Sequence, residues 1–385
     1  MARSIIAVVV VLAVFVAALV LQPFHAGSVS PVARALAAVE PAGAVGSRAP
    51  ELIGGPADWI NTGGKALKLY GPGGVLASDP YAPGKHPVVL VDFWEYTCIN
   101  CIRTLPYVKE WASRYKDDGL IVIGIHTPEF TFAHNAANVA AAVKRFGITY
   151  PVLVDSSYAN WNAYHNQFWP MKYVIDGQGV IVDTHAGEGG YADTEQTLRK
   201  LLLTANPGET LPPAFGDHEH PVSTGAFFDM TDELYAGSAR GVLQNPEGYD
   251  NGQPTTYAPI PPADWNDGEV VLGGRWQVTG EYAQDLQAAP SDMIGVKYHA
   301  LYAVAVIKPQ GGAPIKVLVT QDGAPVPKED AGADLHYDAQ GRSYLNVDAP
   351  REYQIIHNRV FGQHTLALYP DSSDFRLYSF DFAAS

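Results

Sequence analysis

The sequence predicts two folded domains, an α/β domain with a mixed sheet covered by helices on both faces and then an all-β sandwich of jelly-roll type. Between residues 49 and 205, short apolar runs alternate with patterns of helical period. From residue 268 onward, short runs of alternating apolar residues are separated by turn signals. A chain of 385 residues is also too long for one ordinary core.

The first domain is predicted element by element from these runs. Residues 88–93 (VVLVDF) are mostly apolar and β-branched, as in a strand covered on both faces. Residues 97–115 repeat apolar side chains at helical spacing. By the same criteria we expect further strands at 120–125, 151–155, 171–176 and 179–185, and further helices at 135–146, 158–166 and 194–203.

In the second domain the predicted strands are shorter and more numerous. Residues 297–307 alternate apolar and other side chains, the pattern of a half-buried strand. The other expected strands are 275–282, 315–321, 343–347, 353–357, 364–369 and 375–382, whereas the proline-rich residues 254–262 are expected to be irregular.

The N-terminus predicts export. Residues 5–21 form an uninterrupted apolar run behind the single positive charge of Arg3, which favours an uncleaved signal anchor over a cleaved signal peptide. In either case the rest of the chain lies outside the cytoplasm, anchored to the membrane or secreted. The expected organisation is an anchor at 1–26, a spacer at 27–48, an α/β domain at 49–205, a linker at 206–245 and a sandwich at 246–385.

Charge and cysteine content narrow the function. A net charge of −15 argues against binding nucleic acid. The chain has only two cysteines, Cys98 and Cys101. A bridge across so short a loop constrains little chain entropy, so stapling the fold is a weak reason to keep the pair. We therefore expect the two cysteines to be chemically reactive rather than a structural bridge.

The position of the cysteines suits thiol–disulfide exchange. A strand, a short turn and a helix that opens at Cys98 place this sulfur at a helix N-terminus, where unpaired N–H groups and the helix dipole favour a thiolate. Cys101 lies one turn further along and can resolve a mixed disulfide on Cys98. Asp92 ends the preceding strand, where burial should raise its pKa and let it accept the proton of Cys101. Pro106 should kink the helix, and Pro170 stands where a cis-proline would face the sulfurs.

These residues resemble the thioredoxin family. Residues 91–101 (VDFWEYTCINC) with Pro106 are similar to the thioredoxin signature at matching spacings. The resemblance implies that Cys98 is the nucleophile, Cys101 the resolving thiol, Asp92 the buried carboxylate and Pro170 the cis-proline. Residues 49–52 (APEL) and 126–130 (HTPEF) look like the exported TlpA-type branch.

Further motifs resemble the extracytoplasmic half of DipZ proteins, over about residues 47–385. They are the CINC and HTPE segments, Trp161, Tyr164, Trp169-Pro170 and the GEG segment at 187–189. The resemblance implies a C-terminal sandwich like a carbohydrate-binding module. It also implies protein thiol or disulfide substrates and no cofactor besides the redox-active disulfide. DipZ proteins carry a multi-pass electron-importing domain, so a reductase with this chain's single apolar segment needs a separate membrane electron donor of the CcdA/DsbD type.

Several alternatives stay open. The cysteines could bridge structurally or form half a zinc site, although no second ligand pair completes one. Trp94, Tyr96 and Trp169 form either an apolar rim for protein substrates or part of the core. Glu95 is expected to be a solvated loop carboxylate, and His126 and His134 to be structural or exposed rather than copper ligands.

Two other functions compete with the oxidoreductase. A peroxiredoxin-like peroxidase would have a Pro and a Thr or Ser shortly before its reactive cysteine, where this chain has Val91 and Glu95. A glycan- or cell-wall-binding protein with a secondary redox domain rests on fold analogy alone. We therefore expect the sandwich to serve for docking or spacing, and the chain to be an extracytoplasmic thiol:disulfide oxidoreductase acting as a reductase.

Overall fold

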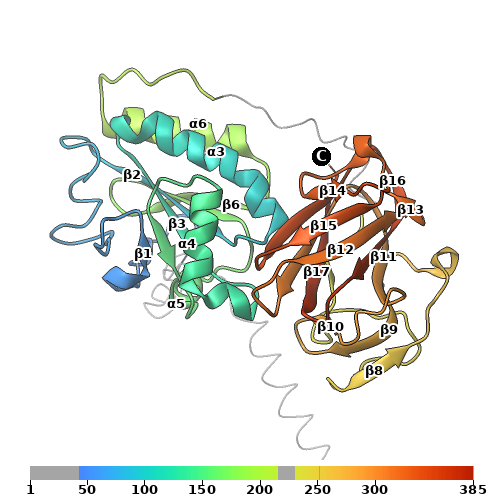
Figure 1. The fold of residues 1–385 in the computed structure, drawn as a ribbon. Coiled ribbons are helices and arrows are strands. Elements are labelled where there is room, and N and C mark those ends of the chain that lie inside the picture. Colours follow the sequence, from blue (N-terminus) through green and yellow to red (C-terminus); the bar gives the residue numbers. More distant parts are fainter. Residues whose placement is uncertain (1–42, 216–229, 251, 385) are drawn as a thin grey trace, which may run out of the picture. The chain divides into compact units, whose positions relative to one another are not determined.

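The fold was determined as a computed structural model that describes residues 43–215, 230–250 and 252–384 (Figure 1). The predicted anchor at 1–26 lies outside the described residues, as do most of the spacer and the middle of the linker. Within the described ranges, no helix has the length and apolar character needed to cross a membrane.

The first domain is built on a six-stranded mixed sheet in the order β1-β4-β3-β2-β5-β6. Its central strand β2 pairs in parallel with β3 and antiparallel with β5, so the predicted mixed sheet is confirmed. The bounds are β1 Trp59–Ile60, β2 Val88–Trp94, β3 Leu120–His126, β4 Val152–Val154, β5 Met171–Ile175 and β6 Ile181–Ala186.

Helices cover both faces of this sheet because successive residues of each strand point to opposite sides. Val88 and Leu90 pack against buried residues of α3, α4 and α6, whereas Val89 and Val91 pack on the face that carries α5. The helices are α3 Ile99–Tyr115, α4 Ala136–Arg145, α5 Ala159–Ala163 and α6 Tyr191–Ala205. Short 3-10 turns occupy η1 Pro56–Asp58, η2 Lys116–Asp118 and η3 Thr131–His134.

The second domain is an antiparallel sheet of eleven strands with the main order β14-β15-β12-β16-β11-β17-β10-β9-β8. Side chains from both ends of this order, such as Leu345 of β15 and Trp276 of β9, belong to one buried cluster. The two ends can share a core only if the sheet folds over itself, as in the predicted sandwich. The first half of β11 pairs with β9 and its second half pairs with β17, so this one strand takes part in both regions of the sheet.

The bounds of the second domain's elements are β7 Leu234–Tyr235, β8 Pro254–Tyr257, β9 Val270–Val278, β10 Ala283–Asp285, β11 Met293–Pro309, β12 Ile315–Gln321, β13 Ala324–Pro325, β14 Leu335–Tyr337, β15 Ser343–Val347, β16 Arg351–Pro370 and β17 Phe375–Ala383, with 3-10 turns η4 Pro262–Asp264 and η5 Lys328–Asp330.

Two expectations about these strands were wrong. The strands predicted at 353–357 and 364–369 are one strand, β16, because it continues across a bulge at residues 358–361 and pairs with β11 again from Gly362. The stretch predicted to be irregular begins with β8, which pairs with β9 at the edge of the sheet, where proline is tolerated.

One face of the second domain packs against the first. Val304 and Val306 of β11 pair with Asp381 and Ser379 of β17, so these side chains share a face of the sheet. On that face Val306 joins the buried cluster of α3, and Val304 joins the cluster of Ile99. The residues that follow the dithiol motif are therefore packed against the sandwich.

Candidate active site

The two cysteines lie where the sequence places them, at the start of α3. Cys98 is the N-cap residue, and its Sγ accepts a hydrogen bond from the backbone N–H of Cys101 at 3.3 Å. Both thiols are free; Cys98 is half-buried and Cys101 is buried. Because an N-cap acceptor satisfies one of the unpaired N–H groups of the helix, this geometry holds the Cys98 sulfur one helical turn from its partner.

The electrostatics of Cys98 differ from the sequence-based expectation. Burial raises the pKa of this thiol well above its usual value, and Cys101 and the charge of Asp381 raise it further. The hydrogen bond from the Cys101 N–H acts in the opposite direction but does not outweigh burial. Burial therefore opposes the stabilisation of the Cys98 thiolate that the sequence predicts for a helix N-terminus.

Asp92 lies in the interior behind Cys101. The side chain is 1% exposed, and burial raises its pKa to about 7, although the opposite charge of Lys172 lowers it. Asp92 pairs across the sheet with Lys172, which is itself fully buried. The charge of Asp92 in turn contributes to raising the pKa of Cys101, after burial. Asp92 was expected from the sequence and Lys172 was not, although a lysine inside the apolar run of a buried strand was a signal for it.

The loop before β5 closes the site from the other side. The Trp169–Pro170 peptide bond is cis, as expected, and the Cys98 thiol faces the carbonyl oxygen of Trp169 at 3.9 Å. The Trp169 ring packs on Trp161 and donates its Nε1–H to the carbonyl oxygen of Thr127 at 3.1 Å. Phe168, immediately before it, is 54% exposed, which makes it an apolar surface residue beside the dithiol.

The expected apolar rim is not formed by Trp94 and Tyr96. Trp94 is fully buried with its ring against His126 and Phe146, so it is a core residue. Tyr96 is 1% exposed and stacks on His126 at 5.3 Å between ring centroids. The neighbouring strand β3 covers both rings, which the local sequence could not show. Trp169 remains the candidate for substrate contact.

Glu95 also differs from its expected solvated state. It is fully buried, and its Oε2 accepts hydrogen bonds from the backbone N–H of Thr97, at 2.6 Å, and from the Thr97 hydroxyl. Its Oε1 lies 3.5 Å from Nε2 of His126, which is also fully buried. Glu95 thus fixes the turn that presents Cys98. An acidic residue between two aromatic residues was the only sequence signal.

The second domain contributes groups that the sequence analysis did not assign to the site. Asp381 of β17 accepts a hydrogen bond from the backbone N–H of Ile99, the first residue of α3. Burial raises the pKa of this carboxyl to about 7. Val304, Ala383 and the partly buried Tyr302 pack around Ile99. A carboxyl group from the sandwich therefore binds the first backbone N–H of the helix whose N-cap is Cys98.

No group of three or more histidine, cysteine, aspartate or glutamate side chains able to hold a metal ion occurs in the described parts of the chain. The chemistry available from the assembled residues is that of two thiols with a buried carboxyl group behind them. Such a set can form a disulfide, break it, and pass a proton.

Comparison with known families identifies both domains. Residues 45–202 match the Redoxin family, and residues 231–383 match the family described as thioredoxin-like C-terminal domain. Residues 45–202 are therefore similar to redoxin domains. This agrees with the thioredoxin-like sheet and the dithiol at the start of α3, and with the DipZ resemblance seen in the sequence.

The chain is similar to DipZ of Mycobacterium tuberculosis, with 34% identity over 341 residues, 87% of this chain and 42% of DipZ. The thiol-disulfide oxidoreductase YkuV of Bacillus subtilis is 29% identical over 31% of this chain and 79% of its own length. A solution structure of a thioredoxin-like protein in the oxidised form aligns with 41% of this chain and 97% of that protein, at 25% identity and a TM-score of 0.34. The chain thus spans less than half the length of DipZ, and its relatives include named thiol-disulfide oxidoreductases.

Proposed function

We propose that this protein is an extracytoplasmic thiol:disulfide oxidoreductase that reduces disulfides in protein substrates through Cys98 and Cys101. The observation that carries the proposal is the Cys98 sulfur at the N-cap of α3, facing both the Cys101 N–H and the carbonyl oxygen before Pro170. A dithiol in this position can alternate between the reduced and the bridged form without moving the helix.

The exchange has two steps. The Cys98 thiol first gives up its proton to water, and the resulting thiolate attacks one sulfur of the substrate disulfide; this forms a mixed disulfide and releases the other substrate sulfur as a thiolate, which takes up a proton from water. Cys101 then loses its proton to Asp92 and attacks the Cys98 sulfur, which frees the second substrate sulfur and leaves the Cys98–Cys101 disulfide. A carboxyl group with its pKa raised to about 7 is suited to taking that proton near neutral pH. The substrate gains two electrons and the protein loses two.

The electrostatics of Cys98 support the reducing direction. A strongly oxidising couple is one whose reduced form is stabilised, as when the attacking cysteine is held as a thiolate. Here burial and the charge of Asp381 disfavour the thiolate. The reduced form is therefore not specially stabilised, and the pair tends to give up its electrons.

The reduced pair must be regenerated after each cycle. We assign this to a separate membrane electron donor of the CcdA/DsbD type that reduces the Cys98–Cys101 disulfide. The apolar run at residues 5–21 would tether the chain outside the cytoplasm beside such a donor. Protein substrates would contact the exposed Phe168 and the partly buried Trp169 next to the cis-proline.

The test is trapping of the reaction intermediate. The reduced full chain and its Cys98→Ser and Cys101→Ser variants are mixed with a disulfide-bonded protein such as insulin, and covalent complexes are resolved without reductant. Cys101→Ser should accumulate a mixed disulfide that dithiothreitol releases, because Cys98 attacks and nothing resolves it. Cys98→Ser should form none, and only the wild type should turn over. Accumulation through Cys101 instead, or insulin reduction by either variant at the wild-type rate, would contradict the assignment.

A further inference from the structure

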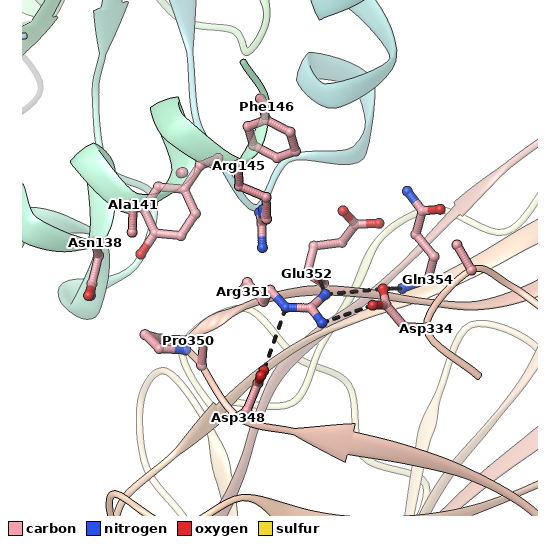
Figure 2. A pocket seen from close by; sticks show the side chains of 14 residues that line it. Asn138, Ala141, Arg145, Phe146, Asp334, Asp348, Pro350, Arg351, Glu352 and Gln354 are labelled. Carbon is pink, nitrogen blue, oxygen red and sulfur yellow. Dashed lines mark hydrogen bonds and ion pairs between the residues drawn. The ribbon is translucent and has the colours of Figure 1, made fainter. Parts of the chain in front are cut away.

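A cleft of about 530 Å³ lies between the C-terminal end of α4 and the turn that joins β15 to β16 (Figure 2). Its walls are partly apolar, with Ala142 and Phe146 on one side and Ala349 and Pro350 on the other. The volume is in the range of sites for small organic ligands. Tyr96, two residues before Cys98, also lines it, so the cleft reaches the loop that carries the dithiol.

Arg145 supplies a cation at the cleft. It ends α4, its guanidinium lies 4.5 Å from the centroid of the Phe146 ring, and it makes no ion pair with any residue that the structure describes. Arg351 across the cleft is different, because Asp334 binds it through two hydrogen bonds of 2.8 and 3.1 Å. The charge of the Arg351 guanidinium is thus neutralised by Asp334, whereas the N–H donors of Arg145 are available to a ligand.

Glu352 supplies a buried carboxyl group that faces the same space. It is 4% exposed, and its Oε1 has no hydrogen-bond partner among the described residues. Figure 2 shows this carboxyl group and the Arg145 guanidinium projecting into the cleft from opposite domains. A buried polar atom without a partner is unfavourable, and a ligand that hydrogen-bonds to it removes that cost.

The protonation of Glu352 sets which ligand fits. Burial raises the pKa of this carboxyl to about 8; Asp334 and Asp381 raise it, whereas Arg145 and Arg351 lower it. Near pH 7 the group is therefore mostly protonated and offers an O–H donor. A guanidinium and the O–H of a carboxylic acid that face one cleft together offer several donors to a ligand, which suits an anionic acceptor.

We propose that this cleft binds the carboxylate of a small amphipathic organic acid, held between Arg145 and Glu352 with its apolar body against Phe146 and Pro350. A cation would be repelled by Arg145, and a dianion would meet the carboxylates of Asp334 and Asp348, which also line the cleft. A neutral ligand would leave the charge of Arg145 unpaired. The C-terminal carboxylate of a peptide shares this chemistry, and the experiment separates the two sources. The binding is independent of the redox reaction.

The test measures binding to the reduced full chain by isothermal titration calorimetry at pH 7. The probes are 3-phenylpropionate, its uncharged amide 3-phenylpropionamide, and the dipeptide N-acetyl-alanyl-phenylalanine with a free or an amidated C-terminus. We expect the carboxylate forms to bind at least about tenfold more tightly than the amides, since charge-assisted hydrogen bonds are lost in the amides. Tighter binding of 3-phenylpropionate would indicate a small organic acid as the ligand, and tighter binding of the free-acid dipeptide would indicate a peptide C-terminus.

Two variants and one control locate the site. Arg145→Met should weaken carboxylate binding at least about tenfold. Wild-type affinity should fall as the pH rises through about 8, because Glu352 loses its donor and gains a repelling charge, and Glu352→Gln should abolish this fall. Arg342→Met removes a guanidinium that pairs with Asp338 in the same domain and does not line the cleft, and it should bind like the wild type. Equal binding of amide and carboxylate, unchanged affinity in Arg145→Met, or no binding of any carboxylate up to about 10 mM would overturn the proposal.

Discussion

Replacing Asp381 by asparagine tests whether the sandwich domain controls the reactivity of Cys98. The carboxyl group accepts the Ile99 N–H at the start of α3, and its charge raises the pKa of the Cys98 thiol. Asparagine keeps an oxygen that can accept the same hydrogen bond but removes the charge. Asp381→Asn should therefore lower the pKa of Cys98 and leave the helix in place.

The size of the effect follows from the charge that is removed. At an effective dielectric constant of about 20, two negative charges about 4 to 8 Å apart oppose each other by about 2 to 4 kcal/mol. Asp381, whose pKa is raised to about 7, is ionised at the alkaline pH where Cys98 titrates, so we expect a fall of about two pKa units, or about 2.7 kcal/mol. At alkaline pH below the pKa of Cys98 the thiolate fraction then rises about 100-fold, and the accompanying loss of nucleophilicity reduces the gain in rate to about tenfold.

The assay is the rate of alkylation of Cys98 by iodoacetamide as a function of pH, in chains that carry Cys101→Ser so that one thiol reacts. Asp371→Asn is the matched control, because Asp371 is an exposed acceptor for a backbone N–H on the same domain. The control should follow the parent chain. If Asp381→Asn gives the same pKa as its parent, or a higher one, the sandwich does not act on the nucleophile in this way.

Four further predictions concern three side chains, those of Asp92, Phe168 and Glu95. Asp92→Asn should raise the free energy of unfolding at pH 8 by up to about 4 kcal/mol. The reason is that a carboxyl whose pKa rises from 3.8 to about 7 on folding destabilises the fold increasingly as the pH rises between those values. Urea titrations should show that this gain vanishes by pH 4, and a pH-independent difference would contradict the prediction. The same variant should slow resolution of the mixed disulfide at least about 100-fold. Phe168→Ser should raise KM for a protein disulfide several-fold and leave KM for a small disulfide unchanged. Because Phe168 is exposed, the free energy of unfolding should change by less than about 0.5 kcal/mol. Equal effects on both substrates would exclude a docking role. Glu95→Gln should lower the free energy of unfolding by about 1–3 kcal/mol in urea titrations, because it weakens two buried hydrogen bonds to Thr97, and an unchanged midpoint would refute this.

Much of the fold could be predicted from local pattern. Strands β12 and β15 have the bounds expected from their apolar alternation, and β2 and β3 differ by one residue at one end. The position of the dithiol at the start of α3 followed from the order of strand, turn and helix. These features depend on residues close together in the sequence, which a periodicity can register.

The contribution of the second domain to the site could not be predicted in this way. In β17, Ser379 and Asp381 alternate with Phe380 and Phe382, which belong to the sandwich core. Such an alternation predicts that the polar face meets water. In the fold this face meets the redoxin domain instead, and the polar residues become buried groups beside α3. Glu352 on β16 is buried for the same reason.

The most direct test of the central claim is the redox equilibrium of Cys98 and Cys101 in the full chain. The chain is equilibrated in thiol–disulfide buffers of known potential, the free thiols are alkylated, and the oxidised fraction is measured by mass spectrometry. We predict a reversible two-electron transition with a midpoint close to the value of about −270 mV known for thioredoxin. Two thiols that stay free at every potential, or a midpoint near about −120 mV as in a strong oxidant, would contradict a reducing dithiol at this helix.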